Sequence, residues 1–132
     1  MGKIRIGIIG TGTISESHIR AYRNNAKADI VAIADTNPDR LAEISNRYNI
    51  TKTYNTATEM LNNEKLDAVS VCSWPVNHVE LALLAVEKGL NVLVEKPLGI
   101  NYAETVKLTE AVAKNGKVGM VGMTHRYRND VK

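Results

Sequence analysis

The sequence is poor in the features that mark secreted, membrane-bound or disordered proteins. Its single cysteine, Cys72, excludes an internal disulfide and favours a reducing compartment. No apolar run approaches the roughly 18 residues that a membrane-spanning helix needs. The hydrophobic fraction of 44% is too high for intrinsic disorder, and neither repeats nor low-complexity segments occur. The length of 132 residues is that of one globular domain of ordinary size.

A large charge excess and a targeting segment are also missing. The 17 Lys+Arg residues exceed the 14 Asp+Glu residues by only three, and they are spread along the chain. We therefore expect neither a nucleic-acid partner nor a membrane partner. Gly7 and Gly10 interrupt the apolar run that a signal peptide would require, and Ile6 stands where a myristoylation motif needs Ser or Thr. We expect a cytoplasmic protein whose first residues, from Met1 on, already belong to the fold.

What the sequence does have is an alternation of short apolar runs with longer helical patterns. The short runs are apolar throughout rather than at every second residue, which favours strands buried on both faces of a parallel sheet. We expect strands over residues 3–9, 29–34, 66–72, 90–94 and 117–121, and a short edge strand at 53–54.

Start and stop signals frame the helices between these strands. Asn37 followed by Pro38 predicts a helix that runs to about Tyr48, and a first helix is expected over residues 15–22. Further signals are capping pairs and helix-ending glycines, namely Thr56/Glu59, Asn77/Glu80, Asn101/Glu104, Gly89 and Gly116. The alternation predicts an α/β fold: a Rossmann-type, doubly wound parallel sheet of about six strands, with helices on both faces.

The first strand leads into a glycine-rich loop, residues 10–15, directly before the first helix. Gly10 permits a tight turn, and Gly12 has no Cβ, so a pyrophosphate can approach the backbone at the positive end of the helix. The third position of this fingerprint usually holds Gly or Ala, so Ser15 is a small departure. Taken alone, the motif is equally consistent with a plain turn between a strand and a helix.

Asp35 strengthens the interpretation of the loop as a dinucleotide site. It ends the second strand, 25 positions after Gly10, where a carboxylate can accept hydrogen bonds from the ribose of adenosine. A 2′-phosphate at ~4 Å from this carboxylate would be repelled by about 4 kcal/mol per charge pair at an effective dielectric near 20. The sequence therefore favours NAD over NADP. Arg40 could offset this repulsion, but we interpret it as an exposed helix residue.

A second group of polar residues follows two later strands. Ser73 and Trp74 follow one strand, and Glu95, Lys96 and Pro97 follow the next, so all should lie at the carboxyl edge of the sheet, where ligands bind. With these residues the sequence resembles the N-terminal NAD(P)-binding domain of the glucose-fructose oxidoreductase / inositol dehydrogenase / MocA family. The resemblance covers nearly the whole chain and includes the glycine loop, Asp35, His78, Glu95-Lys96-Pro97, and Arg126-Tyr127 in place of the usual Arg-Phe.

The resemblance implies a catalytic role for Lys96, which would handle the substrate hydroxyl proton while hydride moves to or from nicotinamide. A lysine beside a cationic nicotinamide loses its proton more readily, as a general base must. Glu95 would support the nicotinamide side, or else be a surface carboxylate, and His78 would contact the ligand or cap a helix. Trp74 replaces a proline common in the family and could stack on a ring. The isomer of the Lys96–Pro97 bond stays open.

The predicted cofactor-binding residues are Gly10, Thr11, Gly12, Thr13, Ile14, Asp35, Ser73, Trp74, His78, Glu95, Lys96, Pro97 and Arg126. No metal site is expected, because the three histidines lack ligand spacing. Cys72 is expected to be a buried strand residue without reactivity.

The resemblance further implies a second, α+β domain that forms the substrate pocket and is absent here. Residues 1–121 would be the dinucleotide-binding domain, and residues 122–132 a tail leading toward the missing part. We expect NAD-dependent hydride transfer to or from a sugar or polyol, with poor or no turnover by this chain alone. The alternatives are a non-catalytic NAD-binding or sensing module and a Rossmann domain for another adenine nucleotide. Apolar surface left uncovered would favour homo-oligomers.

Overall fold

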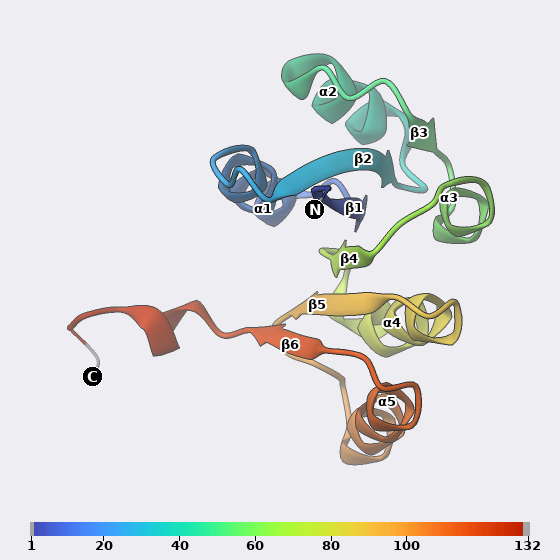
Figure 1. Ribbon diagram of the computed structural model, residues 1–132, viewed down its shortest axis with the longest axis vertical. Helices are drawn as coiled ribbons and strands as arrows, with labels where there is room; N and C mark the ends of the chain where they lie inside the picture. The colour runs from blue at the N-terminus through green and yellow to red at the C-terminus, as the bar shows by residue number, and fades with distance from the viewer. Residues whose placement is uncertain (1, 131–132) are drawn as a thin grey trace.

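The sheet of the computed structural model, which describes residues 2–130, consists of six parallel strands (Figure 1). The strands are β1 (Ile4–Ile9), β2 (Ala28–Ala34), β3 (Thr53–Tyr54), β4 (Ala68–Val71), β5 (Asn91–Glu95) and β6 (Gly119–Gly122). Their order is β3-β2-β1-β4-β5-β6, so the winding direction reverses between β1 and β4. This is the Rossmann arrangement, and the predicted fold class is confirmed.

Helices cover both faces of the sheet, as Figure 1 shows. They are α1 (Thr13–Arg23), α2 (Pro38–Tyr48), α3 (Ala57–Asn63), α4 (His78–Glu87) and α5 (Tyr102–Lys114). One buried cluster joins α1 and α2 to β1 and β2, with Ile19, Ile33 and Ile44 fully enclosed. The other joins α3, α4 and α5 to the opposite face of the sheet. Apolar side chains therefore pack against both faces of the sheet and fix the position of its carboxyl edge.

Local capping signals explain where most helices begin. The side chains of Asn37, Thr56 and Asn101 each accept a hydrogen bond from a backbone N–H in the first turn, as predicted. The prediction for Asn77 is wrong: its side chain caps nothing, and α4 begins at His78 after a 3₁₀ turn over Pro75–Asn77. The backbone of Asn77 is helical (φ −100°, ψ −4°), whereas an N-cap residue needs extended geometry.

Gly10 fixes how the end of β1 meets the end of β4. Its φ of +93° lies in the region that favours glycine. A Cβ at this position would lie 2.6 Å from the backbone nitrogen of Ser73, closer than any real contact. The loop after β1 and the loop after β4 can therefore approach each other only with glycine at this position.

Met1 and the last two residues of the predicted segment 122–132 lie outside the described residues. β6 is followed by a 3₁₀ turn over Thr124–Tyr127, and the boundary expected near residue 121 stays a prediction. Among residues 2–130, no helix has both the length and the apolar character that crossing a membrane requires.

Candidate functional site

A cavity of about 710 Å³ opens at the carboxyl edge of the sheet, where β1, β2 and β4 end. It lies at the reversal of strand order, the usual ligand-binding place in open α/β sheets. Seven of the predicted cofactor residues line it: Gly10, Gly12, Thr13, Ile14, Asp35, Ser73 and Trp74. A separate hollow of about 540 Å³, lined among others by Arg5 and Lys52, contains none of the predicted residues.

The glycine loop presents an open start of α1 to this cavity. Gly12 is the N-cap residue of α1, and a Cβ built on it meets nothing within 4 Å. Among the described residues, no side chain caps this helix. The first backbone N–H groups and the positive end of the helix dipole are therefore available to an anion.

Ser15, the departure from the usual third residue of the fingerprint, stabilises the loop from behind. It is fully buried, and its hydroxyl donates a hydrogen bond of 2.6 Å to the carbonyl oxygen of Gly12. A small polar residue here ties the loop to the first turn of α1 without reaching into the cavity.

Asp35 is held in place by the glycine loop itself. Its Oδ2 accepts hydrogen bonds of 2.7 Å from both the backbone N–H and the hydroxyl of Thr11. Its Oδ1 accepts a bond of 2.8 Å from the backbone N–H of Asn37. Since each carboxylate oxygen can accept two bonds, Oδ1 keeps one free acceptor position, and Asp35 lines the cavity. Thr11 is completely buried and does not line the cavity, so it orients Asp35 rather than facing a ligand.

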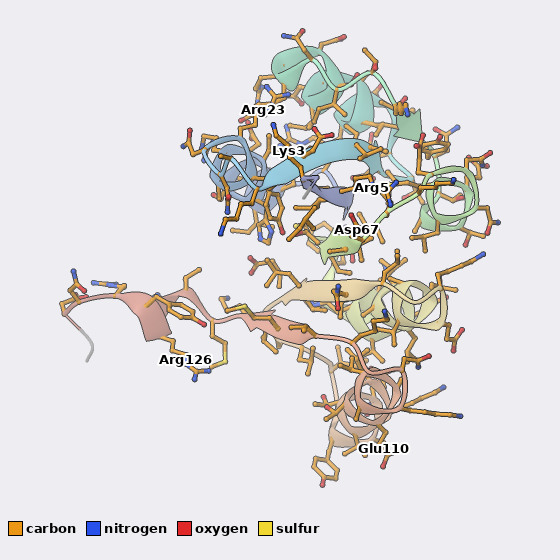
Figure 2. All side chains as sticks on the ribbon, viewed as in Figure 1. Lys3, Arg5, Arg23, Asp67, Glu110 and Arg126 are labelled. Carbon is orange, nitrogen blue, oxygen red and sulfur yellow. The ribbon has the colours of Figure 1, made fainter. Side chains whose placement is uncertain are left out.

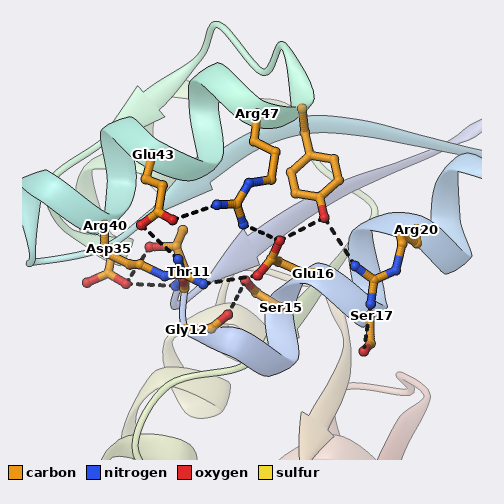
Figure 3. A network of polar contacts seen from close by, with 11 residues as sticks. Thr11, Gly12, Ser15, Glu16, Ser17, Arg20, Asp35, Arg40, Glu43 and Arg47 are labelled. Atoms are coloured by element: carbon orange, nitrogen blue, oxygen red, sulfur yellow. Dashed lines mark hydrogen bonds and ion pairs between the residues drawn. The ribbon is translucent and has the colours of Figure 1, made fainter.

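Arg40 also belongs to this site, and its interpretation as an exposed helix residue is wrong. Its side chain is only 23% exposed and lines the cavity. The Nε–H donates to the carbonyl oxygen of Thr11 at 2.5 Å, while Nη2 and Nη1 contact the carboxylates of Glu16 and Glu43 at 3.2 and 2.8 Å (Figure 3). The side chain thus bends back from α2 over the glycine loop.

Glu16 is the centre of the ion cluster that Figure 3 shows between α1 and α2. Its Oε1 accepts bonds from Arg47 at 2.5 Å and from the hydroxyl of Tyr48 at 2.9 Å. Hydrogen bonds from Arg47 and Tyr48, and then from Arg40, lower the pKa of Glu16 to about 2. Glu16 is therefore ionised at neutral pH.

Glu95 is buried under the sheet edge, so its interpretation as a surface carboxylate is wrong. Its Oε1 lies 2.7 Å from Nε2 of His18, and its Oε2 accepts a bond of 3.2 Å from the backbone N–H of Lys96. Nδ1 of His18 lies 3.2 Å from the hydroxyl of Ser70, which in turn contacts the hydroxyl of Tyr22. A buried polar chain therefore runs from α1 through β4 to the end of β5.

His18 was missed as a positioning residue, because sequence reasoning considered it only as a metal ligand. The available signal was its place one turn after Ser15, on the side of α1 that also buries Ile19. A polar ring on the buried side of a helix needs a partner, but the sequence does not show which one.

His78 lies behind the cavity wall rather than in it. Its side chain is buried, with Nε2 2.9 Å from the carbonyl oxygen of Ser73 and Nδ1 2.7 Å from that of Pro97. A neutral imidazole can donate to one of these carbonyls at a time, and an imidazolium to both. His78 therefore links the loops that follow β4 and β5, and the contact with a ligand stays a prediction.

Lys96 and Pro97 are exposed at the end of β5 and are joined by a cis peptide bond. With β4 between β1 and β5, this point lies on the same edge as the glycine loop, about 10 Å away by strand spacing. Neither residue lines the cavity, nor does Arg126, which is exposed on the segment that extends away from the sheet beyond β6 (Figure 2).

Two further side chains differ sharply in exposure. Trp74 is 79% exposed at the rim of the cavity, while Cys72 is buried, which raises the pKa of its thiol.

Within residues 2–130, no group of three or more histidine, cysteine or acidic side chains could hold a metal ion.

Comparison with known proteins gives a consistent result. The family model described as "Oxidoreductase family, NAD-binding Rossmann fold" matches residues 4–123. Inositol 2-dehydrogenase 3 of Saccharopolyspora erythraea is 36% identical over 126 residues, which cover 94% of this chain and 37% of that protein. Myo-inositol 2-dehydrogenase of Thermotoga maritima is 31% identical over 129 residues, which cover 98% of this chain and 39% of that protein. The chain spans a little over a third of the length of these relatives.

A solved structure shares the fold closely. The WlbA dehydrogenase of Bordetella pertussis, solved in complex with NADH and UDP-GlcNAcA, superposes with a TM-score of 0.90 at 27% identity. The match covers 96% of this chain and 38% of that one.

Proposed function

Because this chain belongs to the oxidoreductase family with an NAD-binding Rossmann fold, we propose that its carboxyl-edge cavity binds NAD. One observation carries this proposal: the uncapped start of α1 at Gly12 and the carboxylate of Asp35, which keeps a free acceptor position, line one cavity of about 710 Å³. The anion site would hold the pyrophosphate, and Asp35 would accept a hydrogen bond from a ribose hydroxyl. NADP would meet the negative charge of Asp35 at its 2′-phosphate.

We further propose that the cofactor serves hydride transfer to or from a sugar or polyol hydroxyl. Bound NAD supplies a nicotinamide that accepts hydride from the alcohol carbon, leaving a carbonyl. Lys96 would take the hydroxyl proton on its Nζ in that direction and return it in the other. The buried Glu95 holds the backbone N–H of Lys96, so the polar chain from His18 orients the loop that carries this lysine.

The chain on its own would turn over poorly. Hydride transfer needs two carbons held at near-attack distance with water excluded, but the described residues leave Lys96 exposed. Since the relatives are more than twice as long, the substrate pocket would come from a part of such proteins that has no counterpart in these 132 residues.

Calorimetric titration of the chain with NAD tests the cofactor proposal. We expect saturable binding that Asp35→Ala weakens, because the ribose hydroxyl then loses its acceptor. Absence of binding to the folded chain would overturn the proposal. An Asp35→Ala variant with unchanged NAD affinity would favour a site for a different nucleotide.

The exposure of Lys96 also favours a second candidate, a non-catalytic NAD-binding or sensing module. The two candidates differ in one measurement, the oxidation of myo-inositol and other polyols by the chain in the presence of NAD. Turnover that Lys96→Ala abolishes would exclude the non-catalytic module. NAD binding without any turnover would support it.

A further inference from the structure

Arg40 has the charge and position of a residue that could read a 2′-phosphate, but its guanidinium is already engaged. It lines the cavity together with Asp35, and both residues contact Thr11. An arginine just after β2 is the usual partner of the 2′-phosphate of NADP. Its present hydrogen-bond partners therefore decide whether Arg40 can bind a 2′-phosphate.

We propose that Glu16 and Glu43 determine cofactor selectivity by holding the Arg40 guanidinium away from a 2′-phosphate. This inference rests on the proposed function, since it concerns the adenosine end of the same cavity. Selectivity for NAD over NADP would then depend on Glu16 and Glu43 as well as on Asp35.

The hydrogen bonds of Arg40 show how the residue is held. Of its five N–H donors, the Nε–H is taken by the carbonyl oxygen of Thr11, one on Nη1 by Glu43 and one on Nη2 by Glu16. A phosphate is bound best by two parallel N–H groups of one guanidinium. The three bonds fix the orientation of the guanidinium and leave one N–H on Nη1 and one on Nη2 for any further partner.

The charges of the ion cluster between α1 and α2, taken together with that of Asp35, also disfavour a 2′-phosphate near Arg40. The three carboxylates Asp35, Glu16 and Glu43 outnumber the two guanidinium groups of Arg40 and Arg47 by one negative charge. Hydrogen bonds from arginines lower the pKa of both glutamates, so both are ionised at neutral pH. A 2′-phosphate would therefore meet a net negative group, whereas neutral glutamines at positions 16 and 43 would make it net positive.

The experiment measures dissociation constants for NAD and NADP by calorimetry on the whole chain. In Glu16→Gln/Glu43→Gln we expect the constant for NADP to fall about tenfold, a change of about 1.4 kcal/mol, with that for NAD within about twofold. Adding Arg40→Ala should cancel the gain. In the parent chain, Arg40→Ala should change NADP affinity less than about twofold, because the arginine is not available there.

A matched control separates this effect from a general change in net charge. Glu87→Gln/Glu110→Gln also removes two carboxylates, one at the end of α4 and one on α5, both exposed and neither among the residues that line the cavity. This variant should leave the ratio of the two dissociation constants unchanged. An equal gain in the control would overturn the inference.

The remaining outcomes each decide a separate question. An unchanged ratio in Glu16→Gln/Glu43→Gln, or a gain that persists without Arg40, would overturn the inference while leaving the NAD proposal intact. Failure of the parent chain to bind NAD would instead overturn the proposed function. If the double variant does not fold, Glu43→Gln alone applies, since the Glu43 side chain is 46% exposed. About a threefold gain in NADP affinity is then expected, and no gain would contradict the inference.

Discussion

Gly10 and Gly12 stand two positions apart in one loop, but a methyl group would meet different surroundings at each. At Gly10 it would collide with the backbone of Ser73, and the backbone has a positive φ. At Gly12 it would point into open space, with φ at an ordinary −69°. The fold therefore excludes a side chain at Gly10, whereas at Gly12 it leaves the space in front of α1 open.

Gly10→Ala should destabilise the protein by at least about 2 kcal/mol, because both the left-handed backbone and the contact with Ser73 must relax. Urea unfolding followed by circular dichroism measures this change. Stability equal to that of the parent would show that the close approach of the β1 and β4 loops is not as described.

Gly12→Ala should leave the free energy of unfolding within about 0.5 kcal/mol of the parent. The affinity for NAD should fall about tenfold or more, because the new methyl group occupies the space in front of α1. Calorimetry and urea unfolding on the same preparation separate the two effects. Unaltered NAD affinity would place the pyrophosphate elsewhere.

His18→Leu should cost about 3 kcal/mol of stability, because it leaves the buried carboxylate of Glu95 without its partner at Oε1. Tyr22→Phe removes only the far end of the same chain and should cost about 1 kcal/mol. In a double-mutant cycle, His18→Leu/Glu95→Leu should be more stable than the sum of the single changes. Additive effects would mean that the two side chains do not interact.

Residue positions were predictable within one strand–loop–helix–strand unit, whereas contacts between side chains far apart in the sequence were not. The glycines and Asp35 follow from spacing along one strand–loop–helix–strand unit. The partners of His18 and Arg40 come from other elements, 77 positions away for Glu95 and 29 for Thr11. No local pattern specifies such pairs, since they exist only after the sheet has formed.

Ion pairs between side chains, as well as apolar packing, connect helices α1 and α2. Glu16 on α1 contacts Arg40 and Arg47 on α2, with Tyr48 adding a hydrogen bond. Removing the charge of Glu16 should therefore weaken the contact between the two helices that flank the adenosine end of the cavity.

This contact gives a specific pH dependence. The pKa of Glu16 is lowered from 4.5 to about 2 in the folded protein, so its contribution is fully present above about pH 4.5 and is lost as the pH falls toward 2. The melting temperature of the parent should exceed that of Glu16→Gln at pH 6, and the difference should shrink below pH 4.5. A difference that grows on acidification would contradict the assigned direction.

Element boundaries were predictable where the signal is local. Asn37, Thr56 and Asn101 bond to N–H groups two or three residues ahead, which the sequence alone can indicate. At Asn77 the same spacing failed because Pro75 starts a 3₁₀ turn and His78 is drawn to the carbonyls of Ser73 and Pro97. Tertiary contacts set the start of α4.

At the scale of the whole molecule, the strand order decides which predicted residues meet. The reversal between β1 and β4 gathers the glycine loop, Asp35 and Ser73 around one cavity. β5 brings Lys96 to the same edge but leaves it exposed and outside the cavity lining. The alternation of elements along the chain was sufficient to predict this edge. It could not predict the enclosed volume, which depends on side-chain packing.

We propose that NAD binds at this edge and not in the hollow at the opposite edge of the sheet. Backbone amide chemical shifts recorded during titration of the ¹⁵N-labelled chain with NAD test it most directly. We expect saturable shifts at Gly12, Thr13 and Asp35, and no shifts at Arg5 and Lys52. Shifts centred on Arg5 and Lys52, or a folded chain whose spectrum NAD does not alter, would contradict it.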